Sequence, residues 1–437
     1  MPISTFMGLH TSLRGLLAEQ RALDVTSHNI ANANTVGYSR QDAQMQATAA
    51  LSVPAAGLLG TGVDVVAYKR IRDSFLDLQY RAQSMQVGYG TARADALDQA
   101  EMRLAEPSDN GIAERLNSFW SSWSDLANAP ESGAARAALI EDARTLVSSI
   151  NALDDGFETV STQAAQELSL LTSNGGELEG MARELAGLNG AIKDSQSVGA
   201  QPNDLLDRRD VLLDRLSSLA QVSVADNGAG SIRVTLGGAA APLVDGATVT
   251  WPAPAMPNPS GKIGALMDAS SPTGTVASYR SDLAGFAQAL TTQVNAIYNP
   301  AAGTDFLAYN AGTATLSINP TVTTATLTAA AGAVGANSAA LSLSELRGKP
   351  GGPDDVYAQL VTRIGTEVAD AKRATINATA LSESIEDRRQ STAGVSLDEE
   401  MTNLIRFQRG YQAAARAMTT ADTLLDTLIN RTGRVGL

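Results

Sequence analysis

The two ends of this 437-residue chain carry apolar residues at the same seven-residue spacing. The first stripe consists of Leu9, Leu13, Leu16, Leu23 and Ile30, and the last of Leu397, Met401, Leu404, Tyr411, Ala415, Met418, Leu425, Leu428 and Ile429. Such spacing predicts long helices with one narrow apolar face. Because one isolated helix cannot bury such a face in water, we expect the ends to pack on each other as an antiparallel pair and on neighbouring subunits. The fold would then close at its termini, with everything else inserted between them.

Polar residues interrupt both stripes at Gln20, Gln408 and Asp422. They fit a stripe that drifts toward solvent, and they equally fit polar groups that fix the register between helices. Both interpretations remain open from the sequence.

The stretch from Ser27 to Gln41 separates two kinds of order. Upstream the spacing is helical, whereas residues 42–53 alternate with a period of two, as in a half-buried strand. Residues 63–68 predict a second short strand. Between helix and strand, Asn29, Asn32 and Asn34 can bond locally to the backbone, and Gly37 can adopt a positive φ. We therefore expect the first helix to stop near Asn34.

The remaining pattern predicts a mainly α fold with inserted β structure. Helical spacing dominates from residue 73 to about 220, with breaks at 88–90, 107–109, 130–133, 175–176, 180 and 199–203, and it returns at 279–298 and 353–390. The last helix begins with a capping box formed by Ser396 and Glu399. The expected domains are a terminal coiled-coil assembly domain (1–41 with 396–437), a β connector (42–71), a helical body (72–220 with 272–299 and 351–395), a small outer β domain (221–271) and an outer insertion of strands and loops (300–350).

Composition removes several classes of function. The chain has no cysteine, and its two histidines, His10 and His28, are too far apart for a local metal motif. The chain has a net charge of −14, with an acidic middle between two nearly neutral ends, which argues against nucleic acid and anionic membranes as partners. We find neither an apolar run long enough to span a membrane nor a cleavable signal peptide, so these features alone would suggest the cytoplasm.

Each candidate for chemistry has a simpler structural explanation. Asp398, Glu399 and Glu400 could form an acid/base pair, but acids in the first turn of a helix are what its dipole favours. The adjacent Ser27 and His28 do not face each other on a helix, so His28 is better explained as an interface residue. The glycines of 57–62 and of 261–262 lack the context of a nucleotide loop. We therefore predict no catalytic, cofactor-binding or metal-binding residue and no enzyme activity.

Specific motifs carry a resemblance to a known family. The segment from Ser27 to Thr35, followed by residues 37–41, resembles the N-terminal signature of bacterial flagellar axial proteins, which include rod, hook and hook-associated proteins. Residues 39–41, the block 203–210 and the ending 397–428 resemble more closely the hook-associated proteins that join hook to filament. The residues that the resemblance implicates as an assembly motif are Asn29, Asn32, Asn34, Gly37, Tyr38 and Arg40.

The resemblance implies a structural subunit of the flagellum that polymerises at the tip of the hook and joins hook to filament. It also implies export through the flagellar secretion channel without a cleaved signal, an extracellular location, and contacts with hook protein, other hook-associated or filament proteins, the export apparatus and an export chaperone. Alternatives are another rod or hook subunit, a cell-wall glycan hydrolase, or a phage or adhesin fibre. Two departures from the family are Val36, where proline is common, and the tail from Arg431 to Leu437.

Overall fold

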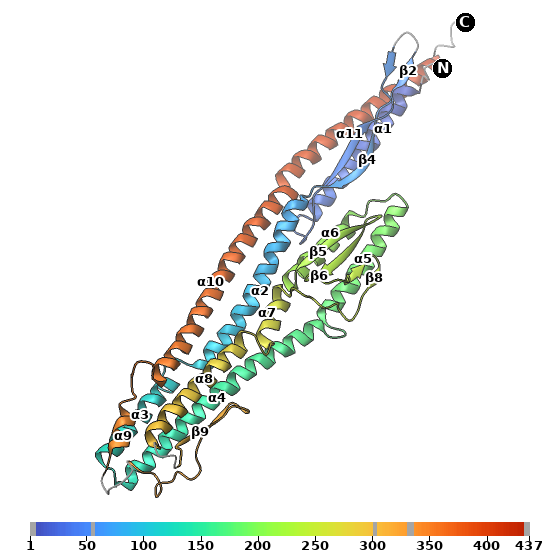
Figure 1. Cartoon of the computed structure of the whole chain (residues 1–437). Helices are drawn as coiled ribbons and strands as arrows, with labels where there is room; N and C mark the ends of the chain where they lie inside the picture. Colours follow the sequence, from blue (N-terminus) through green and yellow to red (C-terminus); the bar gives the residue numbers. More distant parts are fainter. Residues whose placement is uncertain (1–5, 54–56, 300–303, 330–335, 432–437) are drawn as a thin grey trace, which may run out of the picture.

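The computed structural model describes residues 6–53, 57–299, 304–329 and 336–431, so residues 432–437 of the tail lie outside the described residues. The molecule is a long rod of helices with small sheets, and both ends of the chain lie at the same tip (Figure 1). The predicted fold class, mainly α with inserted β, is confirmed. Among the described helices, none combines the length and the apolar character that crossing a membrane requires.

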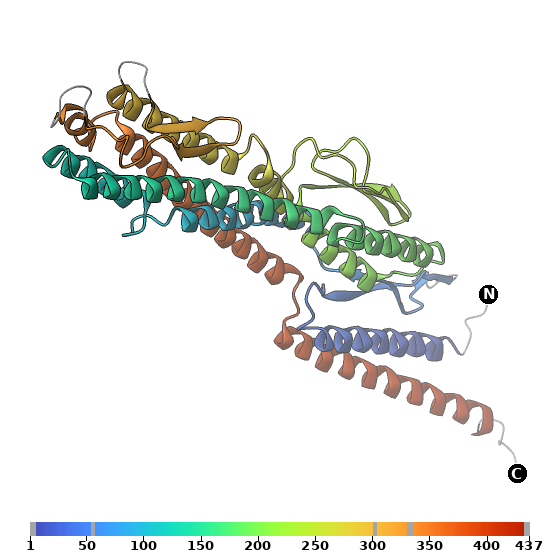
Figure 2. The same cartoon turned by 90° about the horizontal axis from the view of Figure 1, so that it is seen from below.

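Two terminal helices form one end of the rod. They are α1 (Met7–Ala31) and α11 (Leu397–Asp426), and a π-helical turn, η1 (Thr427–Arg431), follows α11. Gly15 lies against Ala414, Glu19 against Gly410 and Asn29 against Glu400. Residue numbers rise on one helix as they fall on the other, so the pair is antiparallel, as predicted (Figure 2). Helix α1 ends slightly before Asn34, because a turn begins at Asn32.

A β hairpin packs beside α1. Strand β1 (Gln41–Ala47) pairs antiparallel with β4 (Val63–Arg70), with a bulge between Gln44 and Met45. Beyond it lies the small hairpin of β2 (Leu51–Val53) and β3 (Gly57–Leu59). The single strand expected over residues 42–53 is therefore split in two. We call residues 6–70 and 397–431 the terminal arm.

The body consists of long helices around a main hydrophobic core. Its helices are α2 (Ser74–Leu104), α3 (Ile112–Asn128), α4 (Gly133–Thr172), α7 (Gly261–Ser270), α8 (Thr275–Tyr298) and α10 (Pro353–Ala393). Large buried aromatic side chains, among them Phe119, Trp123 and Phe286, fill this core. The core lies toward the end of the rod opposite the termini (Figure 1).

A lobe with its own smaller core lies on one side of the body. Helices α5 (Glu177–Ser197) and α6 (Asn203–Leu219) pack on an antiparallel sheet in the order β5 (Val222–Gly228), β6 (Ser231–Leu236), β7 (Val244–Asp245), β8 (Thr248–Val249). The sheet lies within residues 221–271, which the sequence predicted as a small β domain, but α5 and α6 share its core.

Two predicted breaks are wrong. Helix α2 runs unbroken through Gly88 and Gly90, and α5 runs through Gly180. A Cβ on Gly88 would lie 1.9 Å from the carbonyl oxygen of Ser218, and one on Gly90 would lie 2.8 Å from Oγ1 of Thr375. The first two glycines therefore permit close contact of α2 with the end of α6 and with α10, and are not turn residues.

Residues 300–350 contain more regular structure than the expected strands and loops. Strands β9 (Leu307–Asn310) and β10 (Thr315–Ile318) form a hairpin, and α9 (Ser338–Ser344) is a helix that we did not predict. Phe306 and Leu343 from this segment are buried in the main core. Residues 300–303 and 330–335 lie outside the described residues. The domain boundaries given above remain our proposal.

Candidate functional site: the joint between the terminal arm and the body

The side chain of Asn29 holds three parts of the terminal arm together. It is 1% exposed, at the end of α1. Its Nδ2 donates to the carbonyl oxygen of Gln41 at 2.9 Å and to Oε2 of Glu400 at 3.3 Å. Its Oδ1 accepts from the amide of Gln41 at 3.0 Å and from the hydroxyl of Tyr38 at 2.7 Å. The amide thus fixes α1, the start of β1 and the start of α11 relative to one another.

Tyr38 and His28 extend this contact outward. Nδ1 of His28 lies 3.0 Å from the Tyr38 hydroxyl. Because that hydroxyl donates to Asn29, it accepts from His28. Burial, together with Asp204, Asp207 and Glu400, raises the pKa of Tyr38 above its ordinary value. The hydroxyl therefore keeps its proton and remains a donor to Asn29.

The turn between α1 and β1 contacts the start of α6. Asp207 accepts from the amide of Ser39 at 3.1 Å and from its hydroxyl at 2.8 Å. Nδ2 of Asn203 donates to Oε1 of Gln41 at 3.0 Å and to the carbonyl of Tyr68 at 2.9 Å. The block 203–210, which the sequence analysis quoted only for resemblance, thus contacts the signature at 27–41. Spacing along the chain gave no sign of this contact, because the two segments are far apart in sequence.

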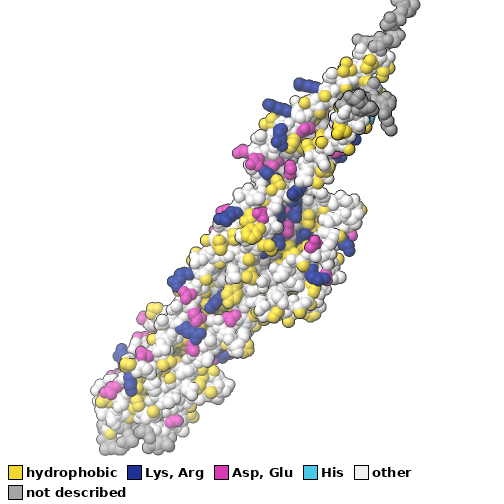
Figure 3. Space-filling model, turned by 45° about the horizontal axis from the view of Figure 1, so that its top comes forward, with side chains coloured by type: hydrophobic (Ala, Val, Ile, Leu, Met, Phe, Trp, Pro, Cys, Tyr) yellow, Lys and Arg dark blue, Asp and Glu magenta, His cyan; other side chains and the backbone are white. Residues whose placement is uncertain are grey.

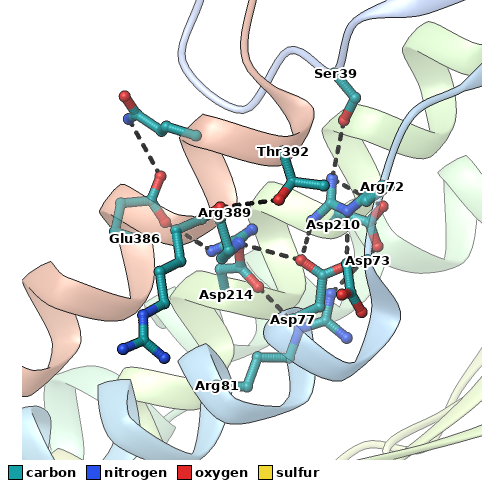
Figure 4. Close-up of polar contacts among 12 residues, drawn as sticks. Ser39, Arg72, Asp73, Asp77, Arg81, Asp210, Asp214, Glu386, Arg389 and Thr392 are labelled. Carbon is teal, nitrogen blue, oxygen red and sulfur yellow. Dashed lines mark hydrogen bonds and ion pairs between the residues drawn. The ribbon is translucent and has the colours of Figure 1, made fainter.

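A ring of charges lies next to Ser39 (Figure 4). Arg72 pairs with Asp77 at 2.7 Å, and Asp77 pairs with Arg389 at 3.1 Å. Asp214 bridges Arg389 at 2.8 Å and Arg81 at 2.8 Å. Asp210 closes the ring, 3.2 Å from Arg81 and 3.3 Å from Arg72. We call these six residues the charge ring.

Further groups attach to the charge ring. Arg70 at the end of β4 contacts Asp207 at 2.7 Å and Asp210 at 3.0 Å. Side-chain exposures of Arg70, Asp207 and the six ring residues range from 7% to 17%. Arg389 also pairs with Glu386 and lies over the ring of Tyr80, 4.3 Å from its centroid. Buried charges of this kind are tolerated because each one has partners of opposite sign.

The electrostatics of Asp210 follow from this arrangement. Burial alone would raise the pKa of its carboxyl, but Arg72, Arg70 and Arg81 outweigh burial and lower the pKa below its ordinary value. Asp210 is therefore charged in the folded protein at neutral pH and anchors three guanidinium groups.

Gly37 adopts a φ of +79°, as expected from its place at the exit from α1. A Cβ there would lie 2.1 Å from Cγ2 of Val211 on α6. Two features therefore favour glycine at this position, the backbone conformation and the close approach of a neighbour. Val36 beside it is strongly exposed.

The other motif residues have smaller parts in the joint. Asn32 donates to the carbonyl of His28 at 3.0 Å and accepts from Thr35 at 3.2 Å, both near the surface. Asn34 is exposed on the same turn. The backbone amide of Arg40 donates to the carbonyl of Ala393 at 2.8 Å, and its side chain pairs with Glu399. Glu399 therefore faces Arg40, while Oγ of Ser396 accepts from the Glu399 amide at 3.4 Å, so the structure contains this half of the predicted capping box.

The residues of the two terminal apolar stripes, which we predict as the assembly seam, are brought together only in part. Leu13, Leu16, Leu23 and Ile30 are half-buried on α1, and so are Leu404, Tyr411, Met418 and Leu425 on α11, whereas Leu428 and Ile429 are 55% and 68% exposed. The fully buried face of α1 consists instead of Ala18, Ala22, Thr26 and Asn29. Extending the antiparallel register puts Ala18 level with Tyr411 and Ala22 level with Phe407. Helix α1 packs on β1 and β4 as well as on α11, so its buried face of small residues has neighbours on more than one side.

The polar residues that interrupt the stripes lie on the surface of the subunit. Gln20, Gln408 and Asp422 are all exposed in the chain. In this subunit they fit the drift of the stripe toward solvent.

The candidates for chemistry also have structural roles. Glu400 is buried against Asn29, and Glu399 pairs with Arg40. Asp154, Asp155 and Glu158 form the one acidic group close enough to hold a metal among the described residues. Arg280 pairs with Asp154 at 2.7 Å and with Glu158 at 3.5 Å, which accounts for two of these acids as ion pairs.

Comparison with known proteins separates the arm from the body. Residues 9–38 match the family model "Flagella basal body rod protein", and residues 388–431 match "Flagellar basal body rod FlgEFG protein C-terminal". Residues 97–253 match "Flagellar hook-associated protein FlgK helical domain". The two ends of the chain thus match models named for basal body rod proteins, and residues 97–253 match a model named for a hook-associated protein.

Two relatives align with nearly the whole chain. Flagellar hook-associated protein 1 of Bacillus subtilis (strain 168) is 31% identical, over 98% of this chain and 99% of that protein. The protein of the same name from Escherichia coli (strain K12) is 27% identical, over 97% and 99%. A solved structure of the flagellar hook junction protein FlgK from Burkholderia pseudomallei aligns with 53% of this chain and 47% of its own, at 22% identity and a TM-score of 0.46. Because the similarity to the Bacillus subtilis protein extends over nearly the whole of both sequences, the chain belongs to the family of flagellar hook-associated protein 1.

Proposed function

We propose that this chain is a structural subunit of the bacterial flagellum that polymerises at the tip of the hook and joins the hook to the filament. One observation carries the proposal: the similarity to hook-associated protein 1 extends over nearly the whole of both chains. The relatives called flagellar hook-associated protein 1 belong to a family of structural flagellar proteins. We propose that this chain likewise has no catalytic role.

The joint supports a division of labour within the subunit. We propose that the terminal arm provides the contacts between subunits, with the assembly motif at Asn29, Asn32, Asn34, Gly37, Tyr38 and Arg40 setting its geometry. Exposed apolar side chains remain on the arm, including Leu58, Leu424, Leu428 and Ile429 (Figure 3). Apolar side chains left exposed on an elongated subunit favour packing against other subunits. Hook protein, other hook-associated or filament proteins, the export apparatus and an export chaperone are the partners that we propose.

Deletion of the gene tests the proposal. We expect cells that build hooks but carry no filaments and do not swim, and a plasmid copy should restore both. Electron microscopy separates the alternatives, because loss of the hook itself would indicate a rod or hook subunit. Turnover of peptidoglycan by the purified protein, abolished by one Asp or Glu substitution, would instead favour a glycan hydrolase.

A further inference from the structure

The chain passes between the terminal arm and the body at two short segments, and neither is helical. Residues 71–73 connect β4 to α2, and residues 394–396 connect α10 to α11. Both hydrophobic clusters lie within 94–371, so in the described part of the chain neither cluster extends into the arm. With short irregular connections and no shared apolar core, the direction of the arm depends on local contacts between side chains and backbone, as at a hinge.

Asp207 on α6 connects two parts of the arm to the body. It is 5% exposed, and it accepts from the amide of Ser39 at 3.1 Å and from the hydroxyl of Ser39 at 2.8 Å. Nη1 of Arg70, at the end of β4, donates to the same carboxylate at 2.7 Å. Because Ser39 is buried as well, loss of these bonds leaves polar groups without water to replace them. One carboxylate therefore contacts both the turn before β1 and the end of β4.

Asn203 makes a similar connection one turn earlier on α6. Its Nδ2 donates to Oε1 of Gln41 at 3.0 Å and to the carbonyl oxygen of Tyr68 at 2.9 Å. Nε2 of Gln41 donates in turn to Oδ1 of Asp204 at 3.1 Å, and the amide of Tyr68 donates to Oε1 of Gln201 at 2.9 Å. Gln41 lies on β1 and Tyr68 on β4, so the start of α6 contacts both strands of the arm. We call Asn203, Asp204 and Asp207 the arm seat.

The arm seat is fixed to the body through the rest of α6. Asp214 on the same helix pairs with Arg81 of α2 and with Arg389 of α10, both at 2.8 Å. The charge ring thus ties α6 to α2 and α10, and a change of the arm relative to α6 is a change relative to the body. Helix α10 meets the arm through the backbone bond from the amide of Arg40 to the carbonyl oxygen of Ala393, beside the second crossing.

We propose that the arm seat sets the direction of the terminal arm relative to the body, with Asn203 and Asp207 as the positioning residues. Without their contacts the arm keeps its own packing of α1 on α11 and on the β hairpin, and it turns about the two crossings. A cavity of about 630 Å³, lined by parts of 33–40, 72–77 and 386–396, lies beside both crossings and gives the arm room to turn. The inference does not rest on the junction role, because it concerns a single subunit.

The absence of cysteine makes the test direct. Gln412→Cys on α11 and Ser169→Cys on α4 replace exposed residues and accept a pair of fluorescent dyes for single-molecule energy transfer in the full chain. We expect one narrow distribution for the unaltered chain. A second pair, Ser169→Cys with Ala374→Cys on α10, joins two exposed sites within the body and serves as the reference.

The seat variant combines Asn203→Ala with Asp207→Ala. Alanine is a good helix former, which favours retention of α6, and Arg70 keeps Asp210 as a partner at 3.0 Å. We expect the arm-to-body distribution to broaden, while the reference pair stays narrow and the helical circular dichroism is retained.

The arm-side variant, Ser39→Ala with Gln41→Ala, removes side-chain partners of the seat and leaves the sequence of α6 unchanged. It should broaden the same distribution. Gln41→Ala and Asn203→Ala together should broaden it less than the sum of their separate effects, because the two changes remove one shared hydrogen bond. Fully additive effects would contradict the seat.

Arg208→Gln is the matched control, because it removes a charge from the first turns of α6 whose ion pair, with Glu184 of α5, is exposed and lies within the lobe. It should leave the distribution narrow. A narrow, unshifted arm-to-body distribution in both the seat variant and the arm-side variant would overturn the proposal. Equal broadening of the reference pair would do so as well, because the body itself would then have loosened.

Discussion

Asn29 shows how one amide can set the geometry of the arm. All of its hydrogen-bonding groups are used, by Gln41, Glu400 and Tyr38, in a place without solvent. We expect Asn29→Leu to leave the carboxylate of Glu400 and the backbone of Gln41 unsatisfied, at a cost of roughly 1 to 3 kcal/mol for each buried group. Hydrogen exchange of α1 in the purified subunit measures the effect.

Asn32→Leu is the matched comparison for that change. The partners of Asn32 lie near the surface, so water can replace the lost hydrogen bonds and the expected cost is about 1 kcal/mol or less. Equal loss of protection in α1 for the two variants would contradict the role that we assign to Asn29.

The second residue-scale prediction concerns Gly37. Gly37→Ala meets both a positive φ and the side chain of Val211, whereas Gly199→Ala meets a φ of +78° with nothing within 4 Å. Strain at a positive φ costs of order 1 to 3 kcal/mol in both variants, and only Gly37→Ala must also displace a neighbour. We expect thermal unfolding to show a larger loss for Gly37→Ala, and swimming to fail with this variant alone. Normal filaments on hooks that carry Gly37→Ala would show that the joint does not depend on this glycine.

Sequence predicted the conformation of Gly37 but not the burial of Asn29. The need for positive φ is a local property that a turn residue reveals. Burial of Asn29 depends on α11, which begins far along the chain, so its greater importance than Asn32 could not be inferred from local spacing.

At the scale of elements, Gly88 decides how closely α2 approaches α6. Alanine is a better helix former than glycine by about 1 kcal/mol, so propensity alone predicts that Gly88→Ala stabilises α2. The carbonyl of Ser218 lies only 1.9 Å from the new Cβ, and the resulting overpacking costs typically 1 to 3 kcal/mol. We therefore expect net destabilisation of Gly88→Ala by thermal unfolding.

Gly180→Ala provides the control within another helix. Nothing lies within 4 Å of its Cβ, so the propensity gain should appear as a stabilisation of up to about 1 kcal/mol. A stabilised Gly88→Ala would mean that α2 and α6 do not pack as closely as the structure has them.

The buried face of α1 differs from the apolar stripe that the sequence predicted. Heptad spacing correctly predicted that α1 and α11 pair, because an apolar stripe requires a partner. The same spacing predicted that the leucines of α1 form the packing face, whereas the buried face contains Ala18, Ala22 and Thr26. A search for hydrophobic periodicity finds the large apolar side chains. A tightly packed helix face can consist of small ones, so the predicted face and the buried face lie next to each other on the same helix.

At the scale of the whole molecule, most of the long helices and the small β sheet could be predicted from the sequence, but α9 and the charge ring could not. Its members come from α2, α6, α10 and the crossing before α2. Each arginine and aspartate, taken alone, looks like an ordinary solvated residue of a helix. Only the folded structure, which brings these distant segments together, shows that the arginines and aspartates are buried and form ion pairs with one another.

The last prediction separates assembly from folding. Leu425 is half-buried on the arm, while Leu428 and Ile429 are 55% and 68% exposed at its far end. Truncation of all three to alanine should remove apolar contacts between subunits and little from the body, whose core contains none of them. We expect the purified triple variant to keep its main thermal transition, and cells that express it to make hooks without filaments.

Leu170→Ala removes an exposed leucine from α4 and should leave both assembly and melting unchanged. If the triple variant instead unfolded the whole subunit, the end of α11 would have to belong to the main core, and the arm could not be an independent assembly element.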